Sequence, residues 1–579
     1  MRLLPLFLFC LVVGTPASAD PAEDQRFKTL SEREYAWAQA DNSGGEDDER
    51  IAPHLQDVRP AAQAKRLAYL QQVLAELDTI KPARLSPATV VDYQVYRFDI
   101  ERRIASLRFR DYEMPANSDS SFWSSLGYTA RGQFKTEADY RNWLSQLHEI
   151  PAYFAEQIAN MSAGAARGFT PPQVTLTGRD QSVAQVADAK SAEDTFLYLP
   201  FKTMPSVIPA AVQQTMREEA RKAIEGEALP AYRALLSFLR DDYIPHARTS
   251  LAAEALPDGK AWYAAQIKAY ATLDLTPDQI HQTGLAEVAK IHAEMLDVMK
   301  QAGFQGDLPA FLKYLRSDPR FYAKTPQDLL DRAAWIAKLV DGKVGLFIGR
   351  LPRRRFAIVP VPADIAPFYT AGRGGPGQYL VNTYDLPSRP LYQLPALTLH
   401  ESAPGHAFQM PLAQENKAAA KFRQTIYISA YGEGWALYCE RLGDEMGIYQ
   451  TPYERFGMLS YQMWRAARLV VDTGIHHLGW TRDQARAFLH DNTALSDHEI
   501  ETEVDRYISW PGQALSYYLG EMAIRQGRAK AQAALGPKFN LRAFHDAVLE
   551  LGSVPLPVLN ARIDRFIAEG GKGPYPDEE

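Results

Sequence analysis

The chain has 579 residues, of which 46% are hydrophobic, and its 63 basic and 70 acidic side chains give a net charge of −7. No block of basic residues is present, which excludes a dedicated nucleic-acid-binding surface. The length exceeds what one hydrophobic core normally supports, so we expect more than one domain or lobe.

Residues 1–19 have the features of a cleaved secretory signal peptide. A basic residue precedes an apolar run at 3–13, and Ala17-Ser18-Ala19 forms a small-residue cleavage site before Asp20. The run is too short to span a bilayer, and Cys10 within it is a poor site for lipid attachment because a leucine follows it. We therefore predict a secreted or periplasmic protein with no stable membrane span after cleavage.

Helix-start signals recur along the chain and predict a mainly α-helical architecture. Ser86 precedes a proline, and Thr276-Pro277-Asp278-Gln279 combines a capping box with proline at the first helical position. From Pro277 to Lys300 the apolar residues recur at helical spacing. A Pro/Gly-rich joint near 255–260 separates an N-terminal helical region (20–260) from a C-terminal catalytic region (261–579). Two further capping boxes are predicted at Thr481 with Gln484 and at Ser496 with Glu499.

Two short segments depart from the helical pattern. Residues 356–362 and 378–383 are β-prone and are bounded by Pro and Gly. Both precede the histidine motif described next, so we expect a small β-sheet beside that motif.

Residues 399–406, Leu-His-Glu-Ser-Ala-Pro-Gly-His, place two histidines around a glutamate in a chain with only 12 histidines. Histidine and carboxylate are preferred zinc ligands, and a catalytic zinc site uses three protein ligands beside an open position. Glu401, next to His400, could take the proton of an attacking water.

The spacing of these histidines makes a specific demand on the backbone. His400 and His406 are six residues apart, which is about 240° around a regular helix, whereas the common zincin motif has four-residue spacing. Pro404 would also collide with the carbonyl of His400 in a continuous helix. The two histidines can bind one metal only if the chain bends at Pro404-Gly405; without such a bend the motif is accidental.

Residues 431–440, Tyr-Gly-Glu-Gly-Trp-Ala-Leu-Tyr-Cys-Glu, could supply the third ligand. Glu433 and Glu440 are seven residues apart and so share a helix face. The pairing of a His-Glu segment with a later Glu-Gly-aromatic-Ala segment resembles the gluzincin metallopeptidases. This resemblance implies that Glu433 is the third ligand and that Glu440 orients a ligating histidine. The alternative is that both are solvated helix charges.

Four phrases are together similar to the bacterial family filed as domain of unknown function 885, which is placed among the zincin-like metallopeptidases: LTLHESAPGHAFQ, YGEGWALY, RLVVDTGIHHLGWT and RYISWPGQALSYYLGE. The similarity runs from about residue 20 to the C-terminus and is densest after about residue 366. In that family the His-Glu-x-x-Pro-Gly-His motif is itself the signature. The resemblance implies a large two-lobed helical zincin-like fold with one zinc ion per chain. The ligands so implied are His400, His406 and Glu433, with Glu401 as the general base.

The resemblance also suggests how a substrate binds. Zincins hold peptides along an exposed edge strand, and residues 378–382, with Tyr379 and Asn382, could fill that role. The alternative for this segment is a small structural hairpin. Arg506 could bind a substrate carboxylate or form a structural ion pair. The predicted partner is a peptide or small protein. The substrate sequence, the mode of cleavage and the oligomeric state do not follow from the sequence.

Two segments offer a group that stabilises the oxyanion of peptide hydrolysis. Asp472 precedes His476 by four residues and could orient its imidazole; the alternative is a helix-terminal histidine paired with a nearby acid. The tyrosines after the Gly-Gln turn at 512–513 resemble the Gly- and Tyr-rich helix that supplies transition-state hydroxyls in some helical zinc peptidases. Of these, Tyr517 is favoured over Tyr518.

We therefore expect a secreted or periplasmic zinc-dependent metallopeptidase. A binding protein with a degenerate zincin fold would lack a ligand or the base, yet all four positions are filled here. A zinc hydrolase acting on a non-peptide amide or ester would use the same site, and the sequence does not separate it from a peptidase.

Overall fold

The chain folds into helices around one small sheet. The structure, a computed structural model, describes residues 19–41, 51–118, 120–363 and 365–575. All but the last residue of the predicted signal peptide therefore lies outside the described residues. The mainly helical architecture and the small sheet are as predicted. None of the helices in the described part of the chain combines the length and the apolar character that a bilayer span needs.

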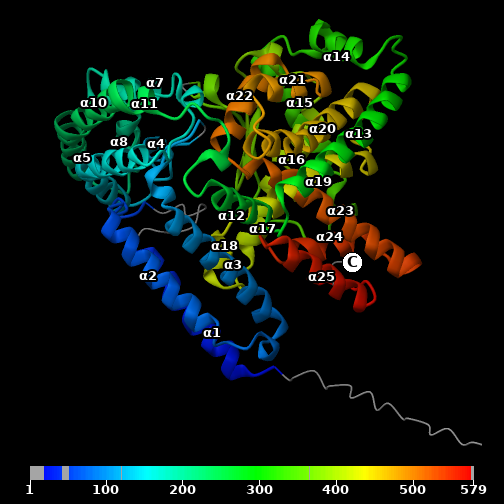
Figure 1. The fold of residues 1–579 in the computed structure, drawn as a ribbon, viewed down its shortest axis with the longest axis horizontal. Helices are drawn as coiled ribbons and strands as arrows, with labels where there is room; N and C mark the ends of the chain where they lie inside the picture. The colour runs from blue at the N-terminus through cyan, green and yellow to red at the C-terminus, as the bar shows by residue number, and fades with distance from the viewer. Residues whose placement is uncertain (1–18, 42–50, 119, 364, 576–579) are drawn as a thin grey trace, which may run out of the picture.

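Three N-terminal helices form an elongated arm, drawn in blue in Figure 1: α1 (Pro21–Ala40), α2 (Pro60–Leu77) and α3 (Pro87–Phe109). They pack around a hydrophobic core of their own, which includes Phe27, Leu70 and Ile100. As predicted, Ser86 caps α3, because its hydroxyl accepts the N–H of Thr89.

A second core belongs to the helices that follow, on the left in Figure 1. Trp143 and Tyr232 lie fully buried in it. This core extends to Ala247, and the core of the C-terminal region includes residues from Ala253 onward. The helices of this second group are α4 (Phe122–Ala130), α5 (Glu137–Ala166), α6 (Gln173–Leu176), α7 (Gln181–Ala187), α8 (Leu199–Lys202), α9 (Ala210–Ala223), α10 (Leu229–Ser237) and α11 (Ile244–His246).

The C-terminal region holds the largest core. Its helices are α12 (Gly259–Ala271), α13 (Pro277–Gln301), α14 (Leu308–Ser317), α15 (Pro326–Asp341), α16 (Leu394–Glu401), α17 (His406–Glu415), α18 (Lys421–Thr425), α19 (Ser429–Glu445), α20 (Pro452–His476), α21 (Arg482–Asn492), α22 (Asp497–Ser509), α23 (Ser516–Leu535), α24 (Leu541–Leu549) and α25 (Leu556–Ala568). α13 packs along α20, and α19 along α23. The predicted capping boxes at the starts of α13, α21 and α22 are confirmed. From Phe456 to His476 every residue of α20 is buried, so its polar side chains must find partners inside the protein.

The sheet has the order β1-β3-β2, with β1 (Ala357–Pro360) parallel and β2 (Gly372–Gly375) antiparallel to β3 (Gln378–Val381). The strands predicted at 356–362 and 378–383 are confirmed as β1 and β3, and β3 forms an antiparallel hairpin with β2. β2, with the sequence Gly-Arg-Gly-Gly, was not predicted because it has no β-branched or aromatic residue. It packs against α16 and α17 and so brings the sheet to the histidine motif.

Candidate metal centre

The backbone breaks between the two motif histidines, as their spacing requires. α16 ends at Glu401 and α17 begins at His406, so residues 402–405 lie outside both helices. A Cβ at Gly405 would lie 1.8 Å from the carbonyl oxygen of His400, so only glycine fits this return of the chain. The indole N–H of Trp435 donates to the carbonyl of Pro404 at 2.7 Å and ties the break to α19. The predicted bend at Pro404-Gly405 is confirmed.

The bend brings His400, His406 and Glu433 together. The Nε2 atoms of His400 and His406 lie 3.4 and 3.3 Å from Oε2 of Glu433. Within the described residues this is the one group of three His, Cys, Asp or Glu side chains whose ligand atoms all lie within 4.8 Å of one another. Both imidazoles are buried.

This donor set fits a zinc ion. Bonds of about 2.0–2.1 Å in a tetrahedron place neighbouring ligand atoms about 3.3–3.4 Å apart, which matches both histidine-to-carboxylate separations. Two imidazoles and one carboxylate are also the ligand types of a catalytic zinc site with one open position.

Glu440 lies directly behind the first histidine. Its Oε1 atom is 2.8 Å from Nδ1 of His400, and the carboxylate is fully buried. An ionised carboxylate only accepts, so Nδ1 carries the proton and Nε2 faces Glu433. The guanidinium of Arg465 lies 4.0 Å from the same carboxylate oxygen. The seven-residue spacing of Glu433 and Glu440 thus places one at each end of the His400 ring.

Acidic and basic side chains in this group shift each other's pKa values. Burial opposes ionisation of Glu433, but His406 and His400 outweigh it and hold the pKa of that carboxyl well below its usual value. Burial likewise lowers the pKa of His400, but the carboxylates of Glu401, Glu433 and Glu440 outweigh it and raise the pKa to about 9. His400 therefore holds a proton that a divalent cation would displace on binding.

Glycines allow the close approach of α19 to its neighbours. A Cβ at Gly434 would lie 2.5 Å from Cα of Gly520, and one at Gly520 would lie 1.9 Å from the carbonyl oxygen of Ala430. The two helices therefore touch through their backbones at these residues. This contact places Tyr517, on the first turn of α23, close to His400 at the end of α16.

Glu401 is held by the sheet. The backbone N–H of Gly374 donates to its Oε2 atom at 2.6 Å. A Cβ at Gly374 would lie 1.7 Å from the carbonyl oxygen of Glu401, so β2 can approach α16 only through glycine. The predicted base therefore sits where the outer edge of β2 meets the end of α16.

Tyr517 and Tyr518 have different surroundings. The ring of Tyr517 lies nearly parallel to that of His400, with centroids 6.5 Å apart and an interplanar angle of 17°. The guanidinium of Arg468 lies over the Tyr517 ring, 4.3 Å from its centroid. Tyr518 is fully buried, and its hydroxyl donates to Glu287 at 2.7 Å. Of these two tyrosines, only Tyr517 adjoins the candidate ligand His400 through its ring.

The predicted pairing of Asp472 with His476 is wrong. Asp472 accepts the hydroxyl of Tyr263 at 2.6 Å and the N–H of Gly512. His476 is fully buried, with Nδ1 accepting the N–H of Ala253 and Nε2 donating to the carbonyl of Tyr507. Both ring nitrogens are thus used by the backbone, which leaves none to donate to an oxyanion.

The predicted substrate strand also needs correction. β3 is the central strand, paired on both sides, and therefore offers no free edge. Tyr379 is fully buried with its hydroxyl 3.5 Å from that of Thr398. Asn382 is equally buried and donates to three backbone carbonyls between residues 366 and 370. Both side chains are therefore buried in contacts within the protein.

Arg506 makes the contacts of a structural residue. Its guanidinium donates to the amide oxygen of Gln513 at 3.3 Å and lies over the ring of Trp510. Burial opposes ionisation of Glu503, but Arg468 and then Arg506 outweigh it and lower the pKa of that carboxyl. These contacts agree with the ion-pair alternative for Arg506.

Two contributors to this centre were missed in the sequence. Gly374 lies in the unpredicted strand β2, and Tyr427 donates its hydroxyl to Oε1 of Glu433 at 3.2 Å. The presence of Gly432 beside Glu433 was the available signal, because a glycine within a helix can mark the close approach of another group.

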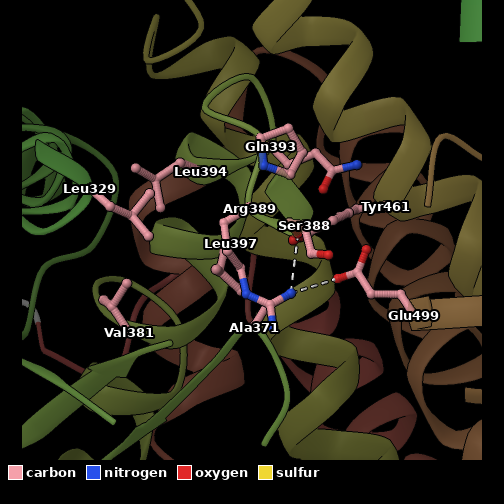
Figure 2. A pocket seen from close by; sticks show the side chains of 11 residues that line it. Leu329, Ala371, Val381, Ser388, Arg389, Gln393, Leu394, Leu397, Tyr461 and Glu499 are labelled. Carbon is pink, nitrogen blue, oxygen red and sulfur yellow. Dashed lines mark hydrogen bonds and ion pairs between the residues drawn. The ribbon is translucent and has the colours of Figure 1, made fainter. Parts of the chain in front are cut away.

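A small cavity of about 20 Å³ lies beside α16, on the side of Leu394 and Leu397. Figure 2 shows the guanidinium of Arg389 in this cavity, bonded to the backbone of Ser388 and to Glu499. This volume accommodates about one water molecule, and none of His400, His406 and Glu433 lines it. It is therefore separate from the metal centre.

Sequence comparison places the chain in a family. The model described as "Bacterial protein of unknown function (DUF885)" matches residues 39–563. The chain belongs to this family. No curated protein matches the DUF885 chain.

Two solved structures are similar to this DUF885 protein. One, from Colwellia psychrerythraea, has 26% identity and a TM-score of 0.84, covering 94% of this chain and 98% of its own. The other, from Shewanella oneidensis, has 20% identity and a TM-score of 0.64, covering 94% of this chain and 99% of its own. Both are described as a "putative lipoprotein", the second of unknown function. The likeness to the second is one of fold alone.

Proposed function

We propose that the chain is a secreted or periplasmic zinc-dependent metallopeptidase that hydrolyses peptide bonds. The observation that carries the proposal is the spacing of the ligand atoms of His400, His406 and Glu433, which suits a tetrahedral zinc ion. The carboxylate of Glu401, next to the first ligand in the chain, adds a base to that centre.

Zinc, when bound, supplies Lewis-acid chemistry that polarises a carbonyl and makes a water more acidic. Glu401 accepts the proton of the attacking water as the new C–O bond forms and delivers it to the leaving nitrogen as the C–N bond breaks. The N–H of Gly374 fixes the orientation of this carboxylate. Glu440 holds His400 with Nε2 toward the centre.

Tyr517 is our candidate for the oxyanion. Its ring lies parallel to that of His400 and beneath the guanidinium of Arg468. A hydroxyl preorganised in such a place donates to the oxygen on which negative charge develops.

The outer edge of β2 is our candidate for substrate binding. This strand is paired only with β3, and its Gly374 lies against Glu401. An extended peptide that pairs with this edge next to Gly374, whose own N–H is donated to Glu401, brings its backbone to the base. The substrate class we propose is therefore a peptide or small protein in extended form.

The export of this protein is proposed from the signal-peptide features of residues 1–19. The description of the 26% identical structure from Colwellia psychrerythraea as a "putative lipoprotein" supports an extracytoplasmic location.

The test is turnover by the wild type and by Glu401→Gln on a library of peptides with free and blocked termini, with ester analogues included. We expect the wild type to cleave peptides, and the variant to keep its zinc and lose cleavage. Cleavage of esters alone favours a non-peptide hydrolase. Equal cleavage by both proteins, or none by the wild type, contradicts the proposal.

A further inference from the structure

The ligand carboxylate Glu433 has a second partner beside the histidines. While its Oε2 atom faces both imidazoles, its Oε1 atom accepts the hydroxyl of Tyr427 at 3.2 Å. The two oxygens of this carboxylate are therefore divided between the ligand group and one phenol.

The position of the Tyr427 ring depends on the absence of a side chain at Gly432. A Cβ there would lie 2.6 Å from the hydroxyl oxygen and from a ring carbon of Tyr427, closer than real Cβ contacts allow. Gly432 lies within α19, where a glycine weakens the helix. Its presence directly before Glu433 is explained by the room it leaves for this ring.

The segment that carries Tyr427 is anchored on both sides. Four residues earlier, Arg423 is buried, forms an ion pair with Asp92 of α3 at 2.8 Å and donates to the carbonyl of Leu551. One residue later, the N–H of Ile428 donates to the hydroxyl of Ser553 at 2.7 Å. The hydroxyl of Tyr427 is thus presented to Glu433 from a fixed backbone.

Phe422 extends this anchor to the N-terminal arm. Its ring contacts that of Tyr96 on α3, with centroids 5.2 Å apart. The arm therefore packs on the same short helix, α18, that leads to Tyr427.

We propose that Tyr427 is a positioning residue of the metal centre: by holding Oε1 of Glu433 it presents Oε2 to the zinc ion and raises the affinity for zinc. The inference rests on the proposed zinc site. A hydrogen bond that fixes a ligating carboxylate orders that side chain before the ion binds, so less entropy is lost on binding. Loss of such a partner typically lowers metal affinity 10- to 100-fold.

The test is zinc affinity, measured on the full mature chain by competition with a chromophoric chelator. We expect Tyr427→Phe to weaken zinc binding about 10-fold or more. Tyr431→Phe is the matched control. Tyr431 also lies close to Glu433 in the chain, on α19, but its hydroxyl donates to the backbone carbonyl of Val548. The Tyr431→Phe protein should bind zinc as tightly as the wild type. Without metal, Tyr427→Phe and Tyr431→Phe should have similar unfolding midpoints.

A second variant keeps the hydroxyl and displaces it. Gly432→Ala should push the Tyr427 ring away and weaken zinc binding in the same direction, whether or not Tyr427→Phe can be purified. Wild-type affinity in both variants overturns this inference alone. A wild type that binds no zinc overturns the proposed function, and this inference with it.

Discussion

Nδ1 of His400 lies 2.8 Å from Oε1 of Glu440, whose carboxylate is fully buried. This contact fixes the tautomer of the imidazole, so that Nε2 faces Glu433. Arg465, stacked on Trp464 at 3.9 Å, lies close enough to the same carboxylate to offset part of its charge. The pairing links the end of the motif helix α16 to the middle of α19.

Replacement of Glu440 by Gln should weaken zinc binding by about 10-fold or more, because the neutral amide supports the histidine less well as a ligand. The measurement is chelator competition on metal-free protein. Glu445→Gln, on the same helix, is the control, since Glu445 is half-exposed and pairs with Arg528. Equal affinities in the two variants would show that Glu440 does not act on the centre.

Replacement of Tyr517 by Phe should lower kcat about 100-fold on a peptide that the wild type cleaves, with little change in zinc affinity, because the oxyanion donor acts in the transition state. Tyr518→Phe is the comparison. It removes the hydrogen bond to Glu287 and should lower the free energy of unfolding. Its kcat should stay close to that of the wild type. A kcat unaffected in Tyr517→Phe would exclude this tyrosine as the donor.

Replacement of Gly520 by Ala should lower the free energy of unfolding by about 1–3 kcal/mol, because overpacking displaces one helix. The added Cβ would lie 1.9 Å from the carbonyl oxygen of Ala430. Denaturant unfolding measures the change. Gly226→Ala has nothing within 4 Å of the new Cβ and should not destabilise. A Gly520→Ala protein as stable as Gly226→Ala would mean that the backbones of α19 and α23 do not meet as described.

The stability of the protein should depend on pH through His476. Burial lowers the pKa of this imidazole to about 3, whereas the unfolded chain takes up the proton near 6.5. The unfolded state therefore binds more protons below pH 6.5, and stability is lost as the pH falls from there toward 3. The change is about 1.4 kcal/mol per pH unit below pH 6.5, so lowering the pH from 7 to 5 should reduce the free energy of unfolding by about 2 kcal/mol.

A comparison of the wild type with His476→Gln isolates this effect. Burial raises the pKa of Asp472 to about 7, and this group stabilises the folded protein toward lower pH, opposite to His476. The free energy of unfolding is measured for both proteins at pH 7 and at pH 5. Because both proteins contain Asp472, its contribution cancels when their losses are compared. We expect the wild type to lose about 2 kcal/mol more than the variant, and equal losses would refute the assignment.

Local signals in the sequence were sufficient for several parts of this fold. The helix that begins at Pro277 could be predicted from its capping residues, and the break at Pro404 from the steric demand of proline. Both depend on residues close together in the chain, where geometry is set by covalent connection.

Contacts between distant segments were not predictable in this way. The four-residue spacing of Asp472 and His476 suggested a pair, but α20 is buried on all sides, and Tyr263 and Gly512 from other elements reach Asp472 instead. Strand β2 has no β-prone residue, and at its Gly374 only glycine fits against the backbone of Glu401. Tyr427 carries no motif, and its role follows from a tertiary contact.

The metal content of purified protein tests the central claim most directly. The wild type and His406→Ala should be purified side by side from zinc-supplemented medium and analysed for bound metal. We predict about one zinc per chain in the wild type and none in the variant, because two remaining ligands cannot hold the ion firmly. Zinc absent from the wild type, or equal in both proteins, would contradict the assignment of His400, His406 and Glu433 as a metal centre.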